Sequence, residues 1–236
     1  MSEFLKTENL SVGYDGRALI RDVCLRVQRG KIVTLIGPNG SGKSTILKTI
    51  VGQLSKVSGT VLLEEKDMAQ MRQNETARRM AILMTQRVHP ELMTCFDVVS
   101  TGRYPYTGAL GLLSREDKSI VMEAMALVNS EDLADRPFDA ISDGQRQRIL
   151  LARALCQQPE VILLDEPTSF LDIKGKIELL TILKELAHTG QLAVILSLHE
   201  LELAEKIADT VVCVSPGGVS GVLTPEQAFQ PENIRA

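Results

Sequence analysis

The chain is organised around residues 37–45, Gly37-Pro38-Asn39-Gly40-Ser41-Gly42-Lys43-Ser44-Thr45. This stretch fits the pattern G-x-x-x-x-G-K-[ST] of a phosphate-binding loop. The apolar run before it, residues 31–36, predicts a buried strand, and residues 44–51 predict a helix. In that context several backbone N–H groups and a helix dipole point at one anion, and the glycines let the anion approach the backbone closely. We therefore predict that the loop binds a nucleotide.

Two side chains of the loop suit the phosphates of a nucleoside triphosphate. Lys43 is expected to reach the β- and γ-phosphates, and the Ser44 hydroxyl is expected to ligate Mg²⁺. The alternative is a chance match in a flexible glycine loop. The strand before the loop and the helix after it argue against that alternative.

Composition restricts the class of protein. The 236 residues are enough for one large domain or two unequal subdomains, and 44% hydrophobic with 24% charged residues is typical of a globular chain. A net charge of −4 argues against nucleic acid as the main partner. There is no apolar run of about 18 residues to span a membrane, and the N-terminus lacks the layout of a signal peptide. The four cysteines are far apart without a CxxC pair, so we expect reduced packing residues in a cytosolic protein, not a zinc site.

The hydrophobic pattern divides the chain into an α/β core and a helical insertion. Strands are expected at residues 4–12, 18–28, 60–64, 80–85, 161–165, 192–198, 211–214 and 219–223. Helices are expected after Thr94 and Ser114, each of which opens a capping box, after Ser142, and over residues 173–187 and 200–208. We therefore expect a core built from residues 1–86 and 159–236, with an antiparallel β region in its first part. Residues 87–158 are expected to form an all-helical subdomain.

Polar side chains follow four predicted strands. They are Lys43, Gln86, the pair Asp165-Glu166, and His199. Ligands of open α/β sheets bind at the carboxyl ends of the strands, so we expect these groups to lie together. Asp165 fits a second position at Mg²⁺, and Glu166 fits a base that polarises an attacking water. Each residue alone has an ordinary structural explanation as a cap, turn or loop residue, but their shared position favours a site.

The order of these motifs resembles that of ATP-binding-cassette (ABC) ATPases over essentially the whole chain. Residues 37–45 resemble the first Walker motif, and residues 161–167 (VILLDEP) resemble the second, with Glu166 as the catalytic glutamate. Residues 141–148 (ISDGQRQR) resemble the family signature, usually L-S-G-G-Q. The other matching positions are Tyr14, the aromatic that stacks on adenine; Gln86, the lid glutamine and a Mg²⁺ ligand; residues 169–172, the loop that crosses the dimer and includes Asp172; and His199, the switch histidine.

The resemblance implies a P-loop NTPase core of mixed sheet with helices, and a mechanism that needs two copies. ATP and Mg²⁺ bound to Lys43, Ser44 and Asp165 of one copy would be covered by the signature of the other. In the signature, Ser142, Gly144 and Gln145 match the family, whereas Ile141 and Asp143 depart from it. The segment is also a capping box, and a cap is compatible with a phosphate site because both use a helix N-terminus. Asp143 adds negative charge near a phosphate unless its carboxylate turns away, which leaves the rate of hydrolysis open.

Four kinds of P-loop ATPase are considered as the function. A DNA-maintenance ATPase would carry long coiled-coil arms, a translation factor would carry two cassettes, and a plain kinase or GTPase would lack the signature. The ATPase subunit of a membrane transporter remains, peripheral at the cytoplasmic face of the cell membrane, with its permease on separate chains and an external binding protein as an indirect partner. Another ABC transporter of metal ions, an exporter, or an ABC ATPase outside transport are the alternatives.

Import is expected, because exporters in bacteria usually fuse pore and ATPase whereas importers often keep the ATPase on a separate chain. Within importers, residues 102–108 (GRYPYTG) resemble a G-R-x-P-x-x-G stretch of the ATPases for iron-siderophores, haem and cobalamin, although the sequence does not identify the cargo. Tyr104 and Tyr106 flank Pro105 in what we interpret as an exposed loop that contacts the permease near Gln86. The alternative is a rigid surface turn.

Overall fold

The computed structural model describes residues 3–85, 90, 92–108 and 111–230. In these residues eleven strands form one sheet, in the order β6-β5-β1-β2-β11-β10-β4-β9-β8-β7 with β3 beside β1. The strands are β1 (Glu3–Tyr14), β2 (Arg17–Val23), β3 (Arg26–Gln28), β4 (Ile32–Ile36), β5 (Ser58–Leu63), β6 (Lys66–Asp67), β7 (Met80–Leu83), β8 (Val161–Asp165), β9 (Ala193–Ser197), β10 (Thr210–Ser215) and β11 (Gly217–Leu223).

The sheet has a parallel half and an antiparallel half. Strands β10, β4, β9, β8 and β7 pair in parallel, and every residue of β4, β8 and β9 is buried. Strands β5, β1 and β2 pair antiparallel. The predicted mixed sheet with an antiparallel N-terminal region is therefore confirmed. Strands buried on both faces read as continuous apolar runs, which is why the sequence located these three so well.

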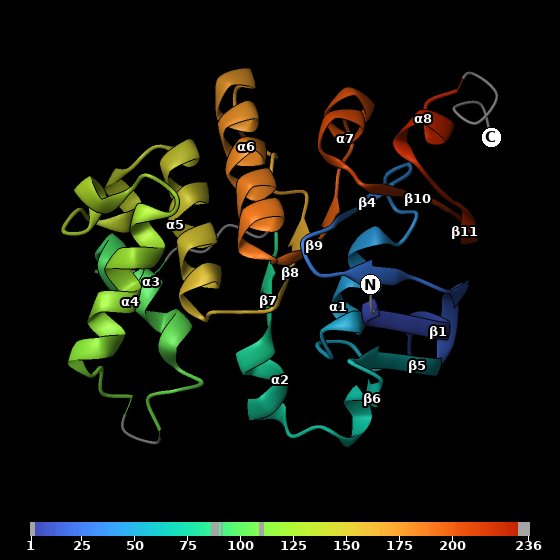
Figure 1. Cartoon of the computed structure of the whole chain (residues 1–236), viewed down its shortest axis with the longest axis horizontal. Coiled ribbons are helices and arrows are strands. Elements are labelled where there is room, and N and C mark those ends of the chain that lie inside the picture. Colours follow the sequence, from blue (N-terminus) through green and yellow to red (C-terminus); the bar gives the residue numbers. More distant parts are fainter. Residues whose placement is uncertain (1–2, 86–89, 91, 109–110, 231–236) are drawn as a thin grey trace.

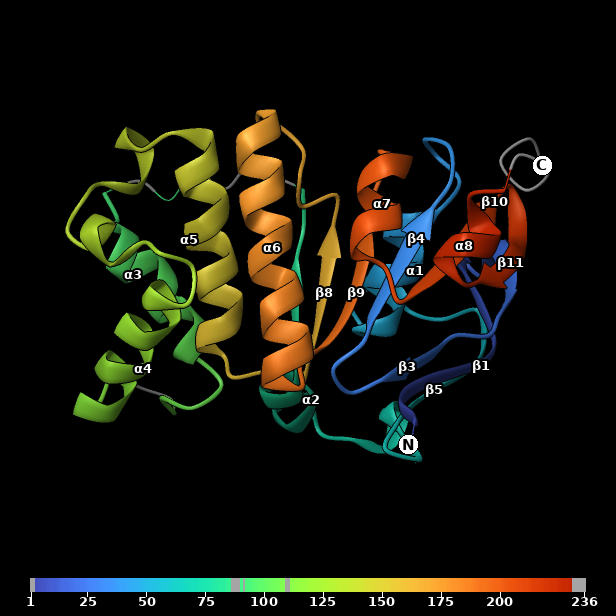
Figure 2. The same ribbon diagram turned by 45° about the horizontal axis from the view of Figure 1, so that its top comes forward.

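Eight α-helices within the described residues surround the sheet (Figures 1 and 2). They are α1 (Lys43–Ile50), α2 (Gln73–Arg79), α3 (Cys95–Ser100), α4 (Arg115–Ala126), α5 (Asp143–Cys156), α6 (Ile173–Gly190), α7 (Leu201–Ile207) and α8 (Pro225–Ala228). In both views α3, α4 and α5 gather on one side of the molecule, the antiparallel strands lie on the other, and α6 stands between them.

The two faces of the parallel half bury two apolar clusters. Along β8, Ile162 and Leu164 belong to the cluster of α5 and α6, whereas Val161 and Leu163 belong to the cluster of α1 and β1. This alternation follows from the period of two along a strand. Helices therefore cover both faces, and the carboxyl ends of β4, β8 and β9 remain at one edge for the polar residues that follow them.

Some predicted elements differ from the observed ones. The strand expected over residues 18–28 is two strands, because β2 and β3 pair with different stretches of β1. Helix α2 was not predicted, since its sequence QNETARR has no apolar period and none of its residues is buried. The three predicted capping boxes at Thr94, Ser114 and Ser142 are confirmed.

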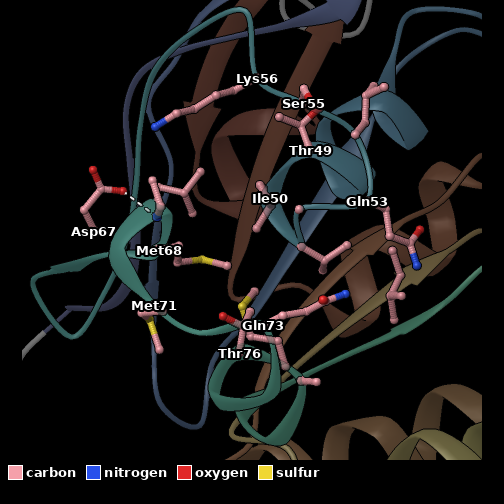
Figure 3. A pocket seen from close by; sticks show the side chains of 18 of the residues that line it. Thr49, Ile50, Gln53, Ser55, Lys56, Asp67, Met68, Met71, Gln73 and Thr76 are labelled. Carbon is pink, nitrogen blue, oxygen red and sulfur yellow. Dashed lines mark hydrogen bonds between the residues drawn. The ribbon is translucent and has the colours of Figure 1, made fainter.

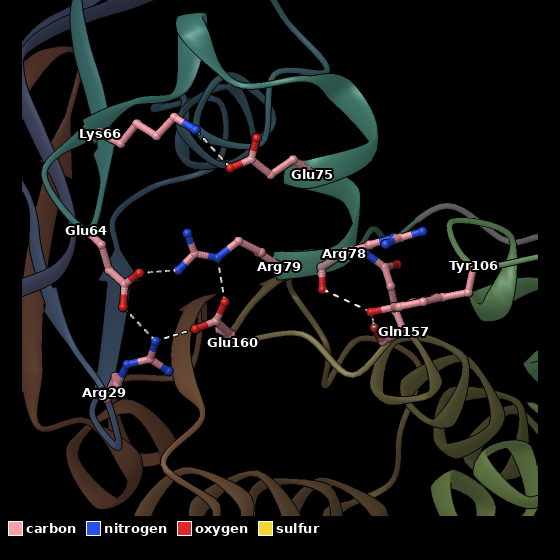
Figure 4. A network of polar contacts seen from close by, with 9 residues as sticks. All are labelled: Arg29, Glu64, Lys66, Glu75, Arg78, Arg79, Tyr106, Gln157 and Glu160. Atoms are coloured by element: carbon pink, nitrogen blue, oxygen red, sulfur yellow. Dashed lines mark hydrogen bonds and ion pairs between the residues drawn. The ribbon is translucent and has the colours of Figure 1, made fainter. Parts of the chain in front are cut away.

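A ring of four charges lies at the amino ends of the parallel strands (Figure 4). Arg29 and Arg79 each contact both Glu64 and Glu160, with 2.9 Å from Arg29 to Glu64 and 2.6 Å from Arg79 to Glu64. Both guanidinium groups also lie over the Phe4 ring. Exposed ion pairs contribute about 0–1 kcal/mol each, but a closed ring restrains all of its members. This ring of charges therefore holds the end of α2, where Arg79 lies, against the sheet.

The segment over residues 102–108 has a different role from the one expected. The exposed fraction of Arg103 is only 4%, and its guanidinium donates to Asp117 at 2.9 Å and to the Cys156 carbonyl at 3.0 Å. Tyr106 packs beneath it, 3.8 Å from the Arg103 guanidinium to the ring centroid, and donates its hydroxyl to the Gln157 carbonyl at 2.9 Å. Of the segment's two tyrosines, only Tyr104, 63% exposed, fits the predicted contact loop. The interpretation of the whole segment as an exposed loop is therefore wrong, because a buried ion pair and a packed ring anchor it to α4 and α5.

Candidate functional site

The glycine loop joins β4 to α1, as predicted, and its glycines have specific steric reasons. A Cβ on Gly37, at φ +150°, would lie 2.1 Å from the Val214 carbonyl oxygen, and one on Gly42, at φ +100°, would lie 2.4 Å from Ile20. Gly40, at φ +77°, has no atom near its missing Cβ, so only its backbone conformation favours glycine. Two of the three glycines therefore let the loop pack against β10 and β2.

Lys43 folds back over this loop. Its Nζ donates to the carbonyl oxygens of Gly37 at 2.8 Å and Pro38 at 3.1 Å, and the residue is 4% exposed. Burial lowers the pKa of Lys43, while the nearby carboxylates of Glu166 and Asp165 act in the opposite direction. No ion-pair partner of Lys43 occurs among the described residues. The ammonium group is thus held at the rim of the loop by neutral acceptors, which an anion can replace.

Asp165 ends β8 in a network of hydroxyl groups. Its Oδ1 accepts from the hydroxyls of Ser44 and Ser197, both at 2.9 Å, and its backbone carbonyl accepts from Thr85 at 2.8 Å. Ser197 also accepts from the backbone N–H of Glu166 at 2.9 Å. Asp165 and Ser197 are direct partners in the register of β8 and β9. Sequence reasoning missed Ser197, because a serine in a buried strand carries no local signal of its partner.

Glu166 and His199 meet at the same edge of the sheet. His199 Nε2 is hydrogen-bonded to Glu166 Oε1, and the Ser169 hydroxyl donates to the other carboxylate oxygen at 3.3 Å. The backbone of Glu166 has a φ of +48°, in the left-handed region that residues with a Cβ rarely adopt. The predicted proximity of Lys43, Asp165, Glu166 and His199 is therefore confirmed for this group.

Tyr14 lies next to the loop at the end of β1. Its ring is 52% exposed, and its hydroxyl is 3.3 Å from Thr45 Oγ1. Asp15, Arg17 and Leu19 border an open hollow beside it. An exposed aromatic face next to a phosphate loop is available for stacking on a flat ring.

The signature segment caps α5. Ser142 and Gln145 form both hydrogen bonds of a capping box, and the Asp143 carboxylate contacts Arg146 at 3.2 Å. A Cβ on Gly144 would meet nothing nearer than Leu171, at 3.9 Å, so the backbone there is open to approach. In both views α6, β8 and β9 lie between α5 and α1 (Figures 1 and 2). The signature and the glycine loop of one chain therefore belong to different parts of the molecule.

The remaining predicted site residues are placed as follows. Asp172 caps α6 and accepts from the Gly175 N–H at 2.8 Å. Asn39 is exposed, whereas Ser41 is buried and its hydroxyl has no hydrogen-bond partner in the part of the chain that is described. Gln86 lies outside the described residues. Thus Asp172 has a structural role at the start of α6, and the Ser41 hydroxyl is a buried group beside Gly37.

The sequence of the chain matches the ABC transporter family over residues 20–169. An uncharacterised ABC transporter ATP-binding protein of Methanocaldococcus jannaschii is 46% identical over 98% of this chain and 79% of its own length. The iron(3+)-hydroxamate import ATP-binding protein FhuC of Bacillus subtilis is 36% identical over 98% and 86%. A cobalamin import ATP-binding protein of Halobacterium salinarum is 35% identical over 98% of this chain and 58% of its own length.

Solved structures agree with this assignment. A transporter described as metal-chelate type, in an inward-facing conformation, is 26% identical with a TM-score of 0.88, over 100% of this chain and 88% of its own. A dimeric ATP-binding cassette bound to ADP and phosphate is 25% identical with a TM-score of 0.80, over 94% and 98%. The chain therefore belongs to the ABC transporter ATP-binding proteins, and it is an ATPase subunit of that family.

Proposed function

We propose that the chain powers the import of a metal chelate or corrinoid, of the iron-siderophore, haem or cobalamin type, by hydrolysing ATP between two copies of itself. The observation that carries the hydrolytic part is the group of Lys43, Asp165, Glu166 and His199 at one sheet edge. Support for the cargo class comes from the relatives, which include import proteins for iron-hydroxamate and cobalamin. Export or metal-ion transport remains the second candidate.

In this proposal residues 37–45 surround the phosphates of ATP, and Lys43 exchanges its two carbonyl partners for β- and γ-phosphate oxygens. Tyr14 stacks on the adenine ring. The group of oxygens around Asp165 fits Mg²⁺, because the Ser44 hydroxyl and the Asp165 carboxylate already lie 2.9 Å apart and this cation prefers oxygen ligands. Bound there, with Gln86 as a further ligand, Mg²⁺ would neutralise developing charge on the phosphates.

Glu166 is the proposed base that polarises the attacking water. His199 and Ser169 hold its two carboxylate oxygens, so its side chain is oriented before the substrate arrives. A base that is positioned by two hydrogen bonds needs little reorganisation at the moment of reaction.

A second copy completes the site. Ser142, Gly144 and Gln145 lie at the N-terminus of α5, away from the glycine loop of their own chain, so they are available to an ATP held by another copy. Asp172 lies in the loop proposed to cross this dimer, although it caps α6 here. The contact of Asp143 with Arg146 keeps its negative charge on its own helix. Two ATP molecules would then join two chains head to tail, and hydrolysis would release them.

The permease is proposed to dock in a hollow between the core and the helical part (Figure 3). The hollow measures about 640 Å³ and is lined by residues of α1, α2, α5 and the segments between them. Met68, Met71 and Met80 contribute to its lining, and Arg153 lies in it without an ion-pair partner among the described residues. Methionine adapts to irregular partner surfaces. Among the helices of the described residues, none has the length and apolarity of a membrane span. In this proposal the pore is formed by separate chains, and this chain lies peripherally at the cytoplasmic face. An external binding protein would deliver the cargo.

The division of the chain is retained as part of the proposal. Residues 1–86 and 159–236 would move as the nucleotide-binding core, and residues 87–158 as the helical signature subdomain that follows the lid glutamine Gln86. A rotation between these two parts would change the shape of the docking hollow, since both parts line it.

The change Glu166→Gln tests the hydrolytic mechanism. The amide keeps the size of the side chain and a hydrogen bond to His199 but cannot accept a proton, so the variant should bind ATP and remain dimeric with ATP and Mg²⁺. Light scattering after size separation measures the dimer, and phosphate release measures turnover. The matched control carries Lys43→Ala as well and should stay monomeric. A Glu166→Gln protein with normal turnover and no ATP-dependent dimer would refute the proposal.

The cargo is tested in cells that lack this chain. Uptake of labelled ferric hydroxamate, haem and cobalamin is compared after return of the wild-type chain or of Glu166→Gln. Import of one of these chelates only with the wild-type chain supports the cargo class. Normal uptake of all three without the chain would exclude them and favour the second candidate.

A further inference from the structure

The first two turns of α6 expose an apolar face. Ile173 is 78% exposed and Ile177 is 54% exposed, and their spacing of four residues places them on one side of the helix. Farther along, Leu179, Leu180 and Leu183 are buried against the rest of the chain. The start of α6 therefore carries large apolar side chains that the fold itself does not use.

The charges around this face are already paired within the chain. Lys174 lies 3.7 Å from Glu178, and Lys176 is paired with Glu200. An apolar centre with a neutralised rim is the composition of a contact surface. Such a face can also meet an identical face without repulsion between like charges.

The face lies beside the part of the site that needs a second copy. Asp172 lies directly before Ile173, at the end of the loop that contains Glu166 and Ser169. On the other side, Leu171 would lie 3.9 Å from a Cβ added at Gly144 in the signature. The start of α6 thus lies between the hydrolytic residues and the signature helix of its own chain. A copy that brings its signature to this ATP has to approach over the same surface.

We propose that Ile173 and Ile177 contact a second copy of this chain in the ATP-bound dimer, and so extend the dimer interface beyond the nucleotides onto α6. The inference rests on the proposed function, which supplies the ATP-dependent dimer. In a two-fold dimer the face occurs twice, so each copy contributes its two isoleucines to the interface. The contact adds affinity to the dimer without touching ATP.

The experiment compares three proteins in the Glu166→Gln background, with ATP and Mg²⁺. The first is the background itself. The second adds Ile173→Glu and Ile177→Glu, and the third adds Met122→Glu and Leu127→Glu, two exposed apolar residues of the α4 region. The dimer dissociation constant is measured by sedimentation, and ATP affinity is measured separately at a concentration where all three proteins are monomeric.

The isoleucine variant should weaken the dimer by at least about tenfold, because four apolar side chains are replaced by four like charges. Its ATP affinity and its unfolding temperature should match the background, and the α4 control should dimerise normally. Replacement of both isoleucines by leucine should preserve the dimer. An unchanged dissociation constant in the isoleucine variant would overturn the inference and leave the proposed function intact. A loss of ATP affinity in that variant would do the same. A background protein that never dimerises would overturn both.

Discussion

Replacement of Arg103 by alanine should destabilise the protein strongly, because this side chain anchors the segment 102–108 to α4 and α5. The guanidinium is 4% exposed and makes three polar contacts, to Asp117 at 2.9 Å and to Cys156 O and Gln158 Oε1 at 3.0 Å each. It also lies 3.8 Å from the centroid of the Tyr106 ring. Its removal leaves a buried carboxylate and a carbonyl of α5 without this donor.

The magnitude follows from these contacts. Loss of one partner of a buried ion pair costs about 3–5 kcal/mol. Asp117 keeps its hydrogen bonds from the Ser114 hydroxyl and N–H, at 2.7 and 2.9 Å, which moves the expected cost of its lost partner toward the lower end. The lost stacking on Tyr106 adds about 1 kcal/mol. We therefore expect Arg103→Ala to lower the free energy of unfolding by about 3–5 kcal/mol.

The assay is urea unfolding followed by circular dichroism, with Arg78→Ala as the matched control. Arg78 also lies over the Tyr106 ring, at 4.8 Å, and donates to the Pro105 carbonyl at 3.1 Å, but it is exposed. Its replacement should cost less than about 1 kcal/mol. If Arg103→Ala is no more destabilising than Arg78→Ala, the segment is a surface turn and the reasoning from burial is wrong.

Three further changes test the site and its supports. Lys43→Ala should weaken ATP binding by about 100-fold in calorimetry, since the loop loses its only side-chain cation, and near-normal affinity would exclude the loop as the phosphate site. Asp143→Gly should cost about 0.5–1 kcal/mol through the lost contact with Arg146 and leave the ATP-dependent dimer unchanged; a longer-lived dimer would show that the carboxylate faces ATP. The pKa of Asp117 is lowered from its ordinary value of 3.8, first by the Ser114 hydroxyl, so its ionised form stabilises the fold above that pH. Asp117→Asn should therefore lower stability at neutral pH, and the difference from wild type should shrink as pH falls below 3.8, whereas a constant difference would contradict this origin.

The sequence predicted the parts of the site that are local in the chain. Two motifs can each be recognised from about ten consecutive residues. They are the glycine loop between a strand and a helix, and the acidic pair after an apolar run. The position of the site at one edge of the sheet then follows, because parallel strands place their carboxyl ends together. Ser197 could not be found in this way. Its role depends on the register that sets it opposite Asp165, which is a property of two strands about thirty residues apart.

The errors have the same physical origin. Residues 102–108 are a turn, as glycine and proline indicate, but the expected exposure of the whole segment was wrong. Gly102 packs closely against α5, where a Cβ would lie 2.3 Å from the Arg153 carbonyl oxygen. The burial of Arg103 could not be read from the sequence, because a charged residue is usually exposed and its partner Asp117 lies fourteen residues away on α4. Helix α2 carries no apolar period, and its last residue is held instead by the ring of Arg29, Glu64, Arg79 and Glu160. Long-range ion pairs, which no local sequence pattern reveals, therefore hold both the segment 102–108 and the end of α2 in place.

The backbone conformation of Glu166 is strained, and the rest of the fold supplies the free energy that maintains it. A residue with a Cβ at φ +48° costs about 1–2 kcal/mol relative to an extended or helical conformation, and glycine would remove that cost. The fold keeps a glutamate there, and the turn brings its carboxylate to His199 and Ser169 while its N–H remains bonded to Ser197. The same serine holds the Asp165 carboxylate, so this carboxylate and the backbone of Glu166 are fixed from one point on β9. The strain is local, and the hydrogen bonds connect neighbouring strands. The rigid parallel half of the sheet can therefore maintain a backbone conformation that an isolated turn would not keep.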